Sequence, residues 1–587
     1  MTDHRPWFAS YPPGVPHSLE PYPEESMFSM LEASARRFPE NPALAWFGKH
    51  MSYSGLLAEV ERCSAMLAGM GVGRGDRVAL IMPNAPHYTI AYYATARLGG
   101  VITGCNPIYT QREMDHQLRD ADPTVVIVAD LMYADFAEVF ADVGIRNVVV
   151  MRLNDYMPLV KKLLAPIAVF KKQQRAAGKP WPPVPKDAPV TRWHVGIRSA
   201  GTIPPVATVK PKEDVAGLIY TGGTTGISKG AALSHYNITS NTRQARAWFP
   251  TIEDGTDAIL GVLPFFHSFG MVAHNLAILK GLKLIPIPNP RDIHMVLESI
   301  AKERASLFAG VPRMYIALNE NPKTPEYDLK SLKVCVSGAA PLPAAVAEEF
   351  ERITEGGRLL EGYGLTETSP LASANPFDGV RKPGTIGLPA PDTDFKLVSL
   401  DDPETELGVD EPGELCIKGP QVMLGYWQRP EESALMIRNG WLHTGDIAVM
   451  DADGYFTIVD RLKDMIIVSG FNVYPTEVED VLYRNPKISK CAVIGVPDDR
   501  TGERVKAYIV LKEGVTATPE EIIAWTKDPE QGLTGYRAPH EIEFRDALPE
   551  TMIGKVLRRV LQEEERAKRG AGEQPAGRES SGAGAAT

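Results

Sequence analysis

A loop rich in glycine and hydroxyl side chains occupies residues 221–230. It follows an apolar run at residues 218–220 and contains four glycines, three threonines, one serine and Lys229. Glycine lets a backbone approach a ligand closely, hydroxyl and amide groups donate hydrogen bonds to phosphoryl oxygens, and a lysine supplies countercharge. The spacing differs from that of a Walker A motif. The loop therefore predicts a polyphosphate site, because a plain surface turn would not need this density of hydroxyl groups.

An aromatic residue between two glycines marks a second motif. Tyr363 lies between Gly362 and Gly364, and Thr366 and Glu367 follow it. The face of a tyrosine ring stacks on a purine, and a carboxylate beside phosphates is a natural ligand for magnesium. Because Gly-Tyr-Gly is common in turns, this motif predicts a nucleotide site only in combination with the first.

A third motif, Trp-Leu-His-Thr-Gly-Asp, spans residues 441–446. Its last residue, Asp446, follows a tight turn and suits the diol of a ribose. An aspartate in a turn also commonly caps its own backbone, so the motif by itself leaves both interpretations open.

These three motifs, in this order, resemble those of the adenylate-forming superfamily of acyl-CoA synthetases, luciferases and peptide-synthetase adenylation domains. The resemblance extends over nearly the whole chain and includes residues 263–267, 336–342, 460–464, 469–472 and 548–555. Within the superfamily the sequence is similar to the bacterial long-chain fatty-acid CoA ligases. The stretches that carry this closer similarity are residues 106–113, 359–363 and 369–376, together with a basic insertion ahead of the phosphate loop.

The resemblance implies an enzyme, an AMP-forming acid–thiol ligase of class EC 6.2.1. Such an enzyme activates a fatty acid with ATP to give acyl-AMP and pyrophosphate, and then transfers the acyl group to CoA. The implied cofactors and cosubstrates are Mg²⁺, ATP and CoA. Two alternatives stay open: a CoA ligase for medium-chain or coumarate-like aryl acids, and an acyl-AMP ligase that feeds a carrier protein.

The same resemblance implies catalytic roles for four side chains. Lys555 would stabilise charge at the α-phosphate as the mixed anhydride forms, and Thr224 and Glu367 would hold Mg²⁺. His267 would position the carboxylate and act in the second half-reaction. A lone histidine on an apolar run is otherwise more typical of a packed core.

Nucleotide and CoA contacts are also implied by the resemblance. Lys463 is expected to be the hinge of a mobile C-terminal domain, and Gly470 is expected to reach the pantetheine channel. Ile467 departs from some long-chain members, which have a lysine that touches the adenylate at this position. The expected ATP and AMP contacts are Tyr220, Thr221, Gly222, Gly223, Thr224, Thr225, Gly226, Ser228, Lys229, Gly338, Ala339, Glu361, Gly362, Tyr363, Gly364, Thr366, Asp446, Arg461 and Lys463.

The elements that position these motifs alternate between helical and strand-like patterns. Residues 53–69 predict a helix, residues 77–82 a buried strand, and residues 88–98 another helix, which is typical of parallel sheets covered by helices. We expect an α/β N-terminal domain at residues 1–462 that includes a β-rich stretch at residues 381–460. A small α+β C-terminal domain follows at residues 463–565, and the composition of residues 566–587 predicts a disordered tail.

Composition excludes several classes of protein. The 587 residues suffice for several domains, and 44% of them are apolar, yet the longest apolar runs are far shorter than the roughly 18 residues of a membrane span. The formal net charge of −11 disfavours a general nucleic-acid binder. Five widely spaced cysteines without a CxxC pair indicate buried thiols in a reducing compartment rather than a zinc site or a disulfide framework. We therefore expect a cytoplasmic enzyme with small-molecule substrates, and a homodimer is one open assembly.

A basic segment at residues 156–186 stands out in this acidic chain, because it carries seven lysines and arginines and no acidic residue. Interleaved apolar residues would suit a peripheral foothold on an anionic membrane. A solvated surface insertion is the equally supported alternative.

Overall fold

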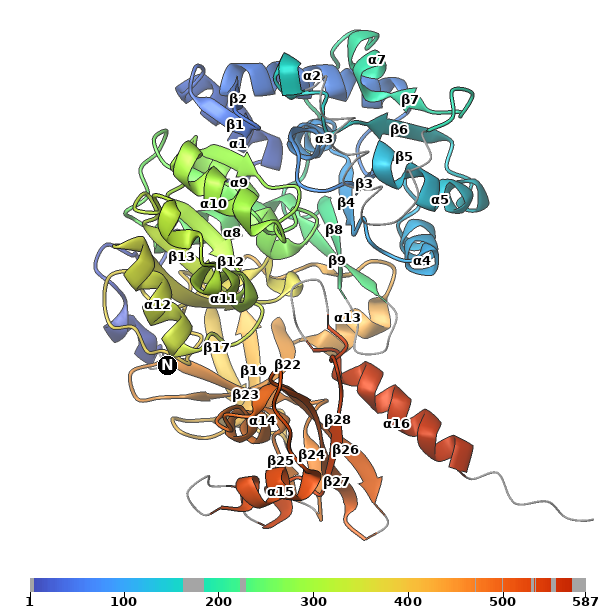
Figure 1. The fold of residues 1–587 in the computed structure, drawn as a ribbon. Helices are drawn as coiled ribbons and strands as arrows, with labels where there is room; N and C mark the ends of the chain where they lie inside the picture. Colours follow the sequence, from blue (N-terminus) through green and yellow to red (C-terminus); the bar gives the residue numbers. More distant parts are fainter. Residues whose placement is uncertain are drawn as a thin grey trace, which may run out of the picture. The chain divides into compact units, whose positions relative to one another are not determined.

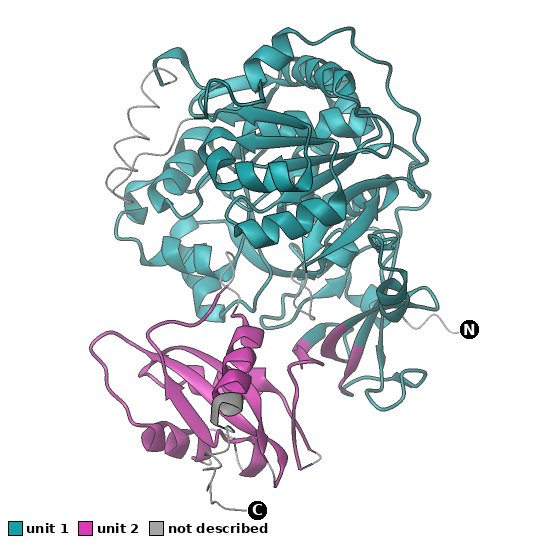
Figure 2. Cartoon of the chain, turned by 90° about the vertical axis from the view of Figure 1, so that its right-hand side faces the viewer, with its two compact units in different colours: residues 1–411, 415–444, 450–457 teal, residues 412–414, 445–449, 458–587 magenta. Residues whose placement is uncertain are grey.

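The computed structural model describes residues 5–161, 184–221, 228–469, 471–498, 500–528, 533, 535–550 and 556–572. The chain forms two compact units, shown in two colours in Figure 2. Unit 1 comprises residues 1–411, 415–444 and 450–457, and unit 2 comprises residues 412–414, 445–449 and 458–587. The mixed α/β architecture expected from the sequence is confirmed (Figure 1).

The first large sheet of unit 1 has eight strands in the order β20-β9-β8-β4-β3-β5-β6-β7. Its strands from β8 to β7 run parallel, and β9 pairs antiparallel with β8. Every residue of β4 and β5 is buried, as expected for parallel strands covered on both faces. The bounds are β3 (Arg77–Ile81), β4 (Val101–Cys105), β5 (Val125–Ala129), β6 (Asn147–Met151), β7 (Thr191–Arg192), β8 (Val215–Thr221), β9 (Lys229–Ser234) and β20 (Gly425–Tyr426).

The second large sheet has nine strands in the order β16-β15-β14-β13-β12-β10-β11-β1-β2. The strands from β14 to β1 run parallel, and both edges are antiparallel. The bounds are β1 (Pro42–Trp46), β2 (Lys49–Ser52), β10 (Ala258–Gly261), β11 (Lys283–Pro286), β12 (Leu307–Gly310), β13 (Val334–Ser337), β14 (Arg358–Gly364), β15 (Leu371–Ala374) and β16 (Leu388–Pro389).

A third sheet forms the β-rich stretch, in the order β18-β17-β19-β22-β21 with β23 beside β22. Strands β19, β22 and β23 belong to unit 1 over part of their length and to unit 2 over the rest. The bounds are β17 (Asp394–Val398), β18 (Glu406–Leu407), β19 (Gly413–Lys418), β21 (Ile437–Arg438), β22 (Trp441–Met450) and β23 (Phe456–Arg461).

Helices cover these sheets. Residues 53–69 form a helix as predicted, and the helix expected at residues 88–98 begins two residues earlier and ends at Arg97. Every residue of that second helix, α3, is buried, because it packs against both α1 and α2. The bounds in unit 1 are α1 (Met27–Arg37), α2 (Tyr53–Gly69), α3 (Pro86–Arg97), α4 (Gln111–Ala121), α5 (Asp130–Val143), α7 (Trp193–Arg198), α8 (His235–Trp248), α9 (Ser268–Lys280), α10 (Ile293–Glu303), α11 (Pro312–Glu320), α12 (Ala344–Thr354) and α13 (Pro430–Met436), with short 3₁₀ turns η1 (Pro6–Ser10), η2 (Thr324–Glu326) and η3 (Thr366–Thr368).

Unit 2 is a smaller α+β body around a sheet in the order β25-β24-β27-β26, with β28 beside β27. Helices α14 and α16 pack on β26, and α15 packs on β28. The bounds are β24 (Ile466–Val468), β25 (Phe471–Val473), α14 (Pro475–Tyr483), β26 (Ile488–Asp498), β27 (Gly502–Leu511), α15 (Pro519–Lys527), η5 (Gly535–Arg537), β28 (Glu541–Phe544) and α16 (Arg558–Gly572). Helix α16 ends at Gly572 and so continues into the range for which composition predicts disorder, where alanine, arginine and lysine favour helix.

Within the described ranges, no helix combines the length and the apolar character that crossing a bilayer requires. All five cysteines are buried.

Candidate active site

The ends of the predicted phosphate loop are brought together by the β8–β9 hairpin. Thr221 pairs with Lys229 across the antiparallel ladder, and the Ser228 hydroxyl donates to the Thr221 carbonyl at 2.8 Å. Residues 222–227 lie outside the described residues, and with them the expected contacts Gly222, Gly223, Thr224, Thr225 and Gly226. The two strands therefore fix both ends of a glycine-rich loop at the edge of a sheet.

The Tyr220 side chain braces this hairpin. Its hydroxyl donates to Asp120 Oδ2 at 2.7 Å, and burial raises the pKa of the phenol. A Cβ atom on Gly230 would lie 3.1 Å from the Tyr220 ring, so the glycine makes room for the ring. Because the hydroxyl of Tyr220 is already bonded to Asp120, the backbone of Tyr220 is the part that can contact a nucleotide.

The side chain of Tyr426 contacts both Lys229 and Glu367. The Tyr426 hydroxyl donates to Glu367 Oε1 at 2.7 Å, while the Lys229 ammonium lies 5.5 Å from the centre of the Tyr426 ring. Lys229 also pairs with Glu432 on α13, and burial, with Arg429 nearby, lowers the pKa of the lysine. The predicted countercharge and the predicted metal ligand therefore share one aromatic side chain.

Close backbone approach explains the glycines around the predicted adenine pocket. A Cβ atom on Gly338 would lie 2.9 Å from the Phe269 ring, and one on Gly364 only 1.7 Å from the Pro370 carbonyl oxygen. Ala339 has a φ of 70°, in the left-handed region. Gly362 and Tyr363 lie on β14, whose neighbour β13 ends at Ser337. The expected base-binding residues thus gather at the carboxyl ends of β13 and β14.

The carboxylate of Glu361, one of the expected nucleotide contacts, has two backbone partners. It accepts hydrogen bonds from the backbone N–H groups of Leu342 at 3.2 Å and Gly384 at 2.9 Å. Burial raises the pKa of this carboxyl group. The side chain therefore ties two loops to the middle of β14, and the expected nucleotide contact of Glu361 stays a prediction.

His267 caps the start of α9. Its Nδ1 accepts from the Phe269 backbone N–H at 3.3 Å, and burial lowers the pKa of the imidazole to about 4. The ring is therefore neutral near pH 7, and because Nδ1 accepts, the proton sits on Nε2. The next residue, Ser268, forms a hydroxyl contact of 3.2 Å with Thr366. The start of α9, which carries His267, and the turn η3, which carries Thr366 and Glu367, are therefore neighbouring segments.

In unit 2, Arg461 Nε lies 2.9 Å from Asp446 Oδ1, so the two predicted ribose ligands form an ion pair. Asp446 is buried. Burial lowers the pKa of Lys463, the expected hinge residue. Gly470, an expected CoA contact, and Lys555, an expected catalytic residue, lie outside the described residues.

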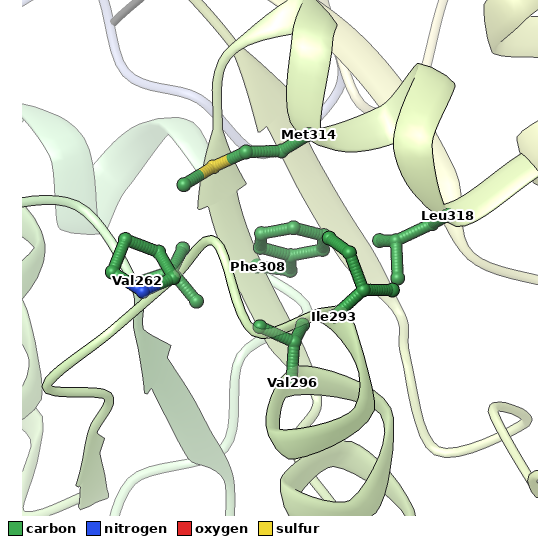
Figure 3. Close-up of a pocket in the computed structure, with 7 residues that line it drawn as sticks. Val262, Ile293, Val296, Phe308, Met314 and Leu318 are labelled. Atoms are coloured by element: carbon green, nitrogen blue, oxygen red, sulfur yellow. The ribbon is translucent and has the colours of Figure 1, made fainter. Parts of the chain in front are cut away.

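A small apolar pocket lies beside the strand ends of the second sheet (Figure 3). Val262 directly precedes the motif at residues 263–267, and Phe308 is two residues before Gly310, whose carbonyl accepts from the Gly338 N–H at 3.3 Å. The gaps between the side chains are too narrow for a water molecule. The lining residues are Val262, Pro290, Ile293, Val296, Phe308, Met314 and Leu318.

Tyr426 and this pocket were missed by sequence reasoning. Tyr426 lies on a strand of two residues, Gly425–Tyr426, which is too short to show periodicity. The pocket combines residues from separate elements, and only their packing places them together.

Comparisons with known proteins agree with these motifs. A family model described as AMP-binding enzyme matches residues 31–427, and one described as AMP-binding enzyme C-terminal domain matches residues 477–555. A long-chain-fatty-acid–CoA ligase of Bacillus subtilis is 41% identical over 96% of this chain and 99% of its own length. A feruloyl-CoA synthase of an Amycolatopsis species is 35% identical over 89% of this chain and 96% of its own. The crystal structure of ATP-bound MatB from Rhodopseudomonas palustris matches with a TM-score of 0.78 and 30% identity, covering 92% of this chain and 98% of that one.

Proposed function

Because the chain belongs to the AMP-binding enzyme family, we propose that it is an AMP-forming ligase that joins a long-chain fatty acid to CoA. The observation that carries the proposal is the 41% identity to a long-chain-fatty-acid–CoA ligase, which extends over nearly the full length of both chains. The assignment agrees with the site, where groups suited to phosphate, carboxylate and magnesium lie on neighbouring segments.

The reaction proceeds in two steps. The fatty-acid carboxylate attacks the α-phosphorus of ATP, forms a P–O bond and expels pyrophosphate, which leaves acyl-AMP. The CoA thiol then loses its proton and attacks the acyl carbon, and AMP departs as the thioester forms. Both steps bring anions together, so the protein must supply cations and oriented donors.

Lys229 lies at the end of the phosphate loop and can supply positive charge to the triphosphate. The Lys229 ammonium group forms an ion pair with Glu432, so a bound triphosphate competes with this carboxylate for it. Glu367 offers a buried carboxylate, the kind of hard oxygen ligand that Mg²⁺ prefers, and Tyr426 orients it. Glu367, with Thr224, would hold the ion, which when bound offsets repulsion between the carboxylate and the triphosphate.

His267 supplies a neutral donor. Since its Nδ1 accepts from the start of α9, the Nε2–H group can donate to an acyl carboxylate without adding a charge. Lys555 would stabilise negative charge in the first step, and the hinge at Lys463 would exchange it for the segment around Gly470 before the second.

The apolar pocket in Figure 3 is the site proposed for the far end of the acyl chain. Phe308 lies at the centre of its labelled side chains, among Met314, Val296 and Ile293. A bound chain must therefore displace at least one of these side chains. Each buried methylene contributes about 0.8 kcal/mol, which makes such a pocket selective for length.

The basic segment at residues 156–186 is proposed as a peripheral contact for an anionic membrane, from which a long-chain acid is delivered. Leu159 and Val160, just before the first of its paired lysines, are 73% and 68% exposed. A surface insertion without a partner is the alternative that vesicle binding tests.

The test of the proposed function is CoA-dependent release of AMP with Mg·ATP across acids from octanoate to oleate, with coumarate, acetate and mixed amino acids for comparison. We expect peak turnover with long fatty acids and none without CoA. Pyrophosphate release without use of CoA would point to a ligase that feeds a carrier protein. A peak at coumarate would favour the aryl-acid alternative, to which the similarity to feruloyl-CoA synthase gives some support.

A further inference from the structure

The segment that carries Lys555 is closed at its base by described residues on both sides. Glu550 and Val556 form an antiparallel bridge, and the Leu557 N–H donates to the Pro549 carbonyl at 2.8 Å. These two ends are the described residues nearest to Lys555 on either side of it, and Lys555 itself lies outside the described residues.

The first end is held by packing and by one ion pair. Glu550 pairs with Lys490 on β26, and Leu548 and Val556 pack in a buried cluster with Leu561 of α16. This end is thus anchored on the sheet of unit 2.

The second end is held by Arg558, the first residue of α16. Its guanidinium group makes a two-pronged contact with Glu479, with Nη2 at 2.6 Å from Oε2 and Nε at 3.2 Å from Oε1. Nη1 lies 3.2 Å from Asp464 Oδ2 and 3.8 Å from Asp460 Oδ1. The Arg558 side chain is only 18% exposed, and three carboxylates from two parts of the chain surround it.

Two of these carboxylates flank the predicted hinge. Asp460 precedes Lys463 by three residues and Asp464 follows it directly. The buried Asp460 carboxylate also accepts from the Thr476 N–H, at the start of α14, at 2.7 Å. Arg558 therefore connects the helix that follows Lys555 to the residues on both sides of the hinge and to α14.

We propose that Arg558 is a positioning residue, which fixes the Lys555 segment against the residues that flank the hinge and thereby acts on acyl-adenylate formation. The inference rests on the proposed function, since it assigns the effect to the first half-reaction. Arg558 thus acts through the position of Lys555 and not by contact with a substrate.

The informative substitution is Arg558→Lys. It keeps the positive charge, so the buried carboxylates retain a countercharge, but a single ammonium group cannot make the two-pronged contact with Glu479 and reach Asp464 together. The neighbouring Arg559 offers a matched control, because it lies on the same turn, is 46% exposed and pairs with Glu563 four residues along the helix.

The experiment measures the half-reactions separately in the full-length enzyme: pyrophosphate release without CoA, and thioester formation from supplied acyl-AMP. A displacement of about 1 Å costs on the order of 100-fold, so we expect Arg558→Lys to slow acyl-AMP formation by about 10- to 100-fold. Thioester formation should stay within about twofold, and Arg559→Lys should leave both rates within the same margin. In a Lys555→Ala background, Arg558→Lys should cause no further loss of acyl-AMP formation.

Equal loss of both half-reactions, or an undiminished effect in the Lys555→Ala background, would overturn the proposal. A second readout does not depend on activity: amide hydrogen exchange of residues 548–557 should be faster in Arg558→Lys than in Arg559→Lys, with the rest of unit 2 unchanged. Unchanged exchange there would also overturn it. If the unsubstituted enzyme releases no pyrophosphate with any acid, the proposed function fails, while hydrogen exchange still tests the position of the segment.

Discussion

Removing one hydroxyl group, in Tyr426→Phe, tests the centre of the candidate site. The phenol donates to Glu367 Oε1 at 2.7 Å, and its ring lies beside Lys229. Phenylalanine keeps the ring and loses only the donor. The perturbation is therefore confined to the orientation of the carboxylate that we propose as a magnesium ligand.

The geometry gives the magnitude. A hydrogen bond to a charged group contributes about 1.5–3 kcal/mol, and Glu367 is 9% exposed, so water replaces the lost donor poorly. That range corresponds to roughly 10- to 150-fold in rate. We expect kcat/KM for acyl-AMP formation to fall by about this factor at limiting Mg²⁺. Thioester formation from supplied acyl-AMP should change by less than about twofold, because it needs no triphosphate.

The assay is pyrophosphate release at several Mg²⁺ concentrations. Tyr327→Phe is the matched control, since it removes a hydroxyl that bonds to His294 on an exposed surface of the same unit. A Tyr426→Phe enzyme with the control's rate at limiting Mg²⁺ would refute the reasoning, and so would equal loss of both half-reactions.

Three further predictions concern the hinge, the buried histidine and the basic segment. Lys463→Pro should spare pyrophosphate release and stop thioester formation, and a variant that still uses CoA normally would contradict the hinge. The pKa of His267 is lowered to about 4 against an ordinary value near 6.5, so the unfolded chain takes up a proton in this interval while the folded one does not. The stabilisation from keeping His267 neutral is complete above pH 6.5 and is lost as the pH falls toward 4. His267→Gln should therefore flatten the dependence of the free energy of unfolding on pH over this interval. An unchanged slope in denaturant titrations would exclude His267 as its cause. Replacing the lysines and arginine of residues 161–175 by glutamine should weaken sedimentation with anionic vesicles in a salt-dependent way, and unchanged sedimentation would favour a plain surface insertion.

Local pattern was enough to predict several elements. Residues 53–69 form a helix with the predicted ends, and the buried strand predicted at residues 77–82 ends one residue earlier, at Ile81. In each case the signal is contained in one stretch: Ser52 caps the helix, and the strand is a mostly apolar run. The strand that precedes the phosphate loop, β8, likewise contains the apolar run at residues 218–220.

Contacts between distant residues could not be predicted. Nothing in the sequence near Glu367 indicates that Tyr426 donates to it, and nothing near Arg558 indicates Asp460 as a neighbour. The Glu361 carboxylate holds two loops, because these loops present backbone N–H groups that no local pattern reveals. The assignments of Lys555, Gly470 and Thr224 stay predictions.

The nine-stranded sheet also has a consequence for synthesis of the chain. Leu44 on β1 pairs in parallel with Leu284 on β11, some 240 positions later. At about 5–20 residues per second, a ribosome needs roughly 10–50 s to deliver that partner. Throughout this interval the β1–β2 hairpin has one unsatisfied edge outside the exit tunnel, which is the kind of surface that chaperones shield. The order of strands in this sheet therefore sets how long the β1–β2 hairpin waits for β11 during synthesis.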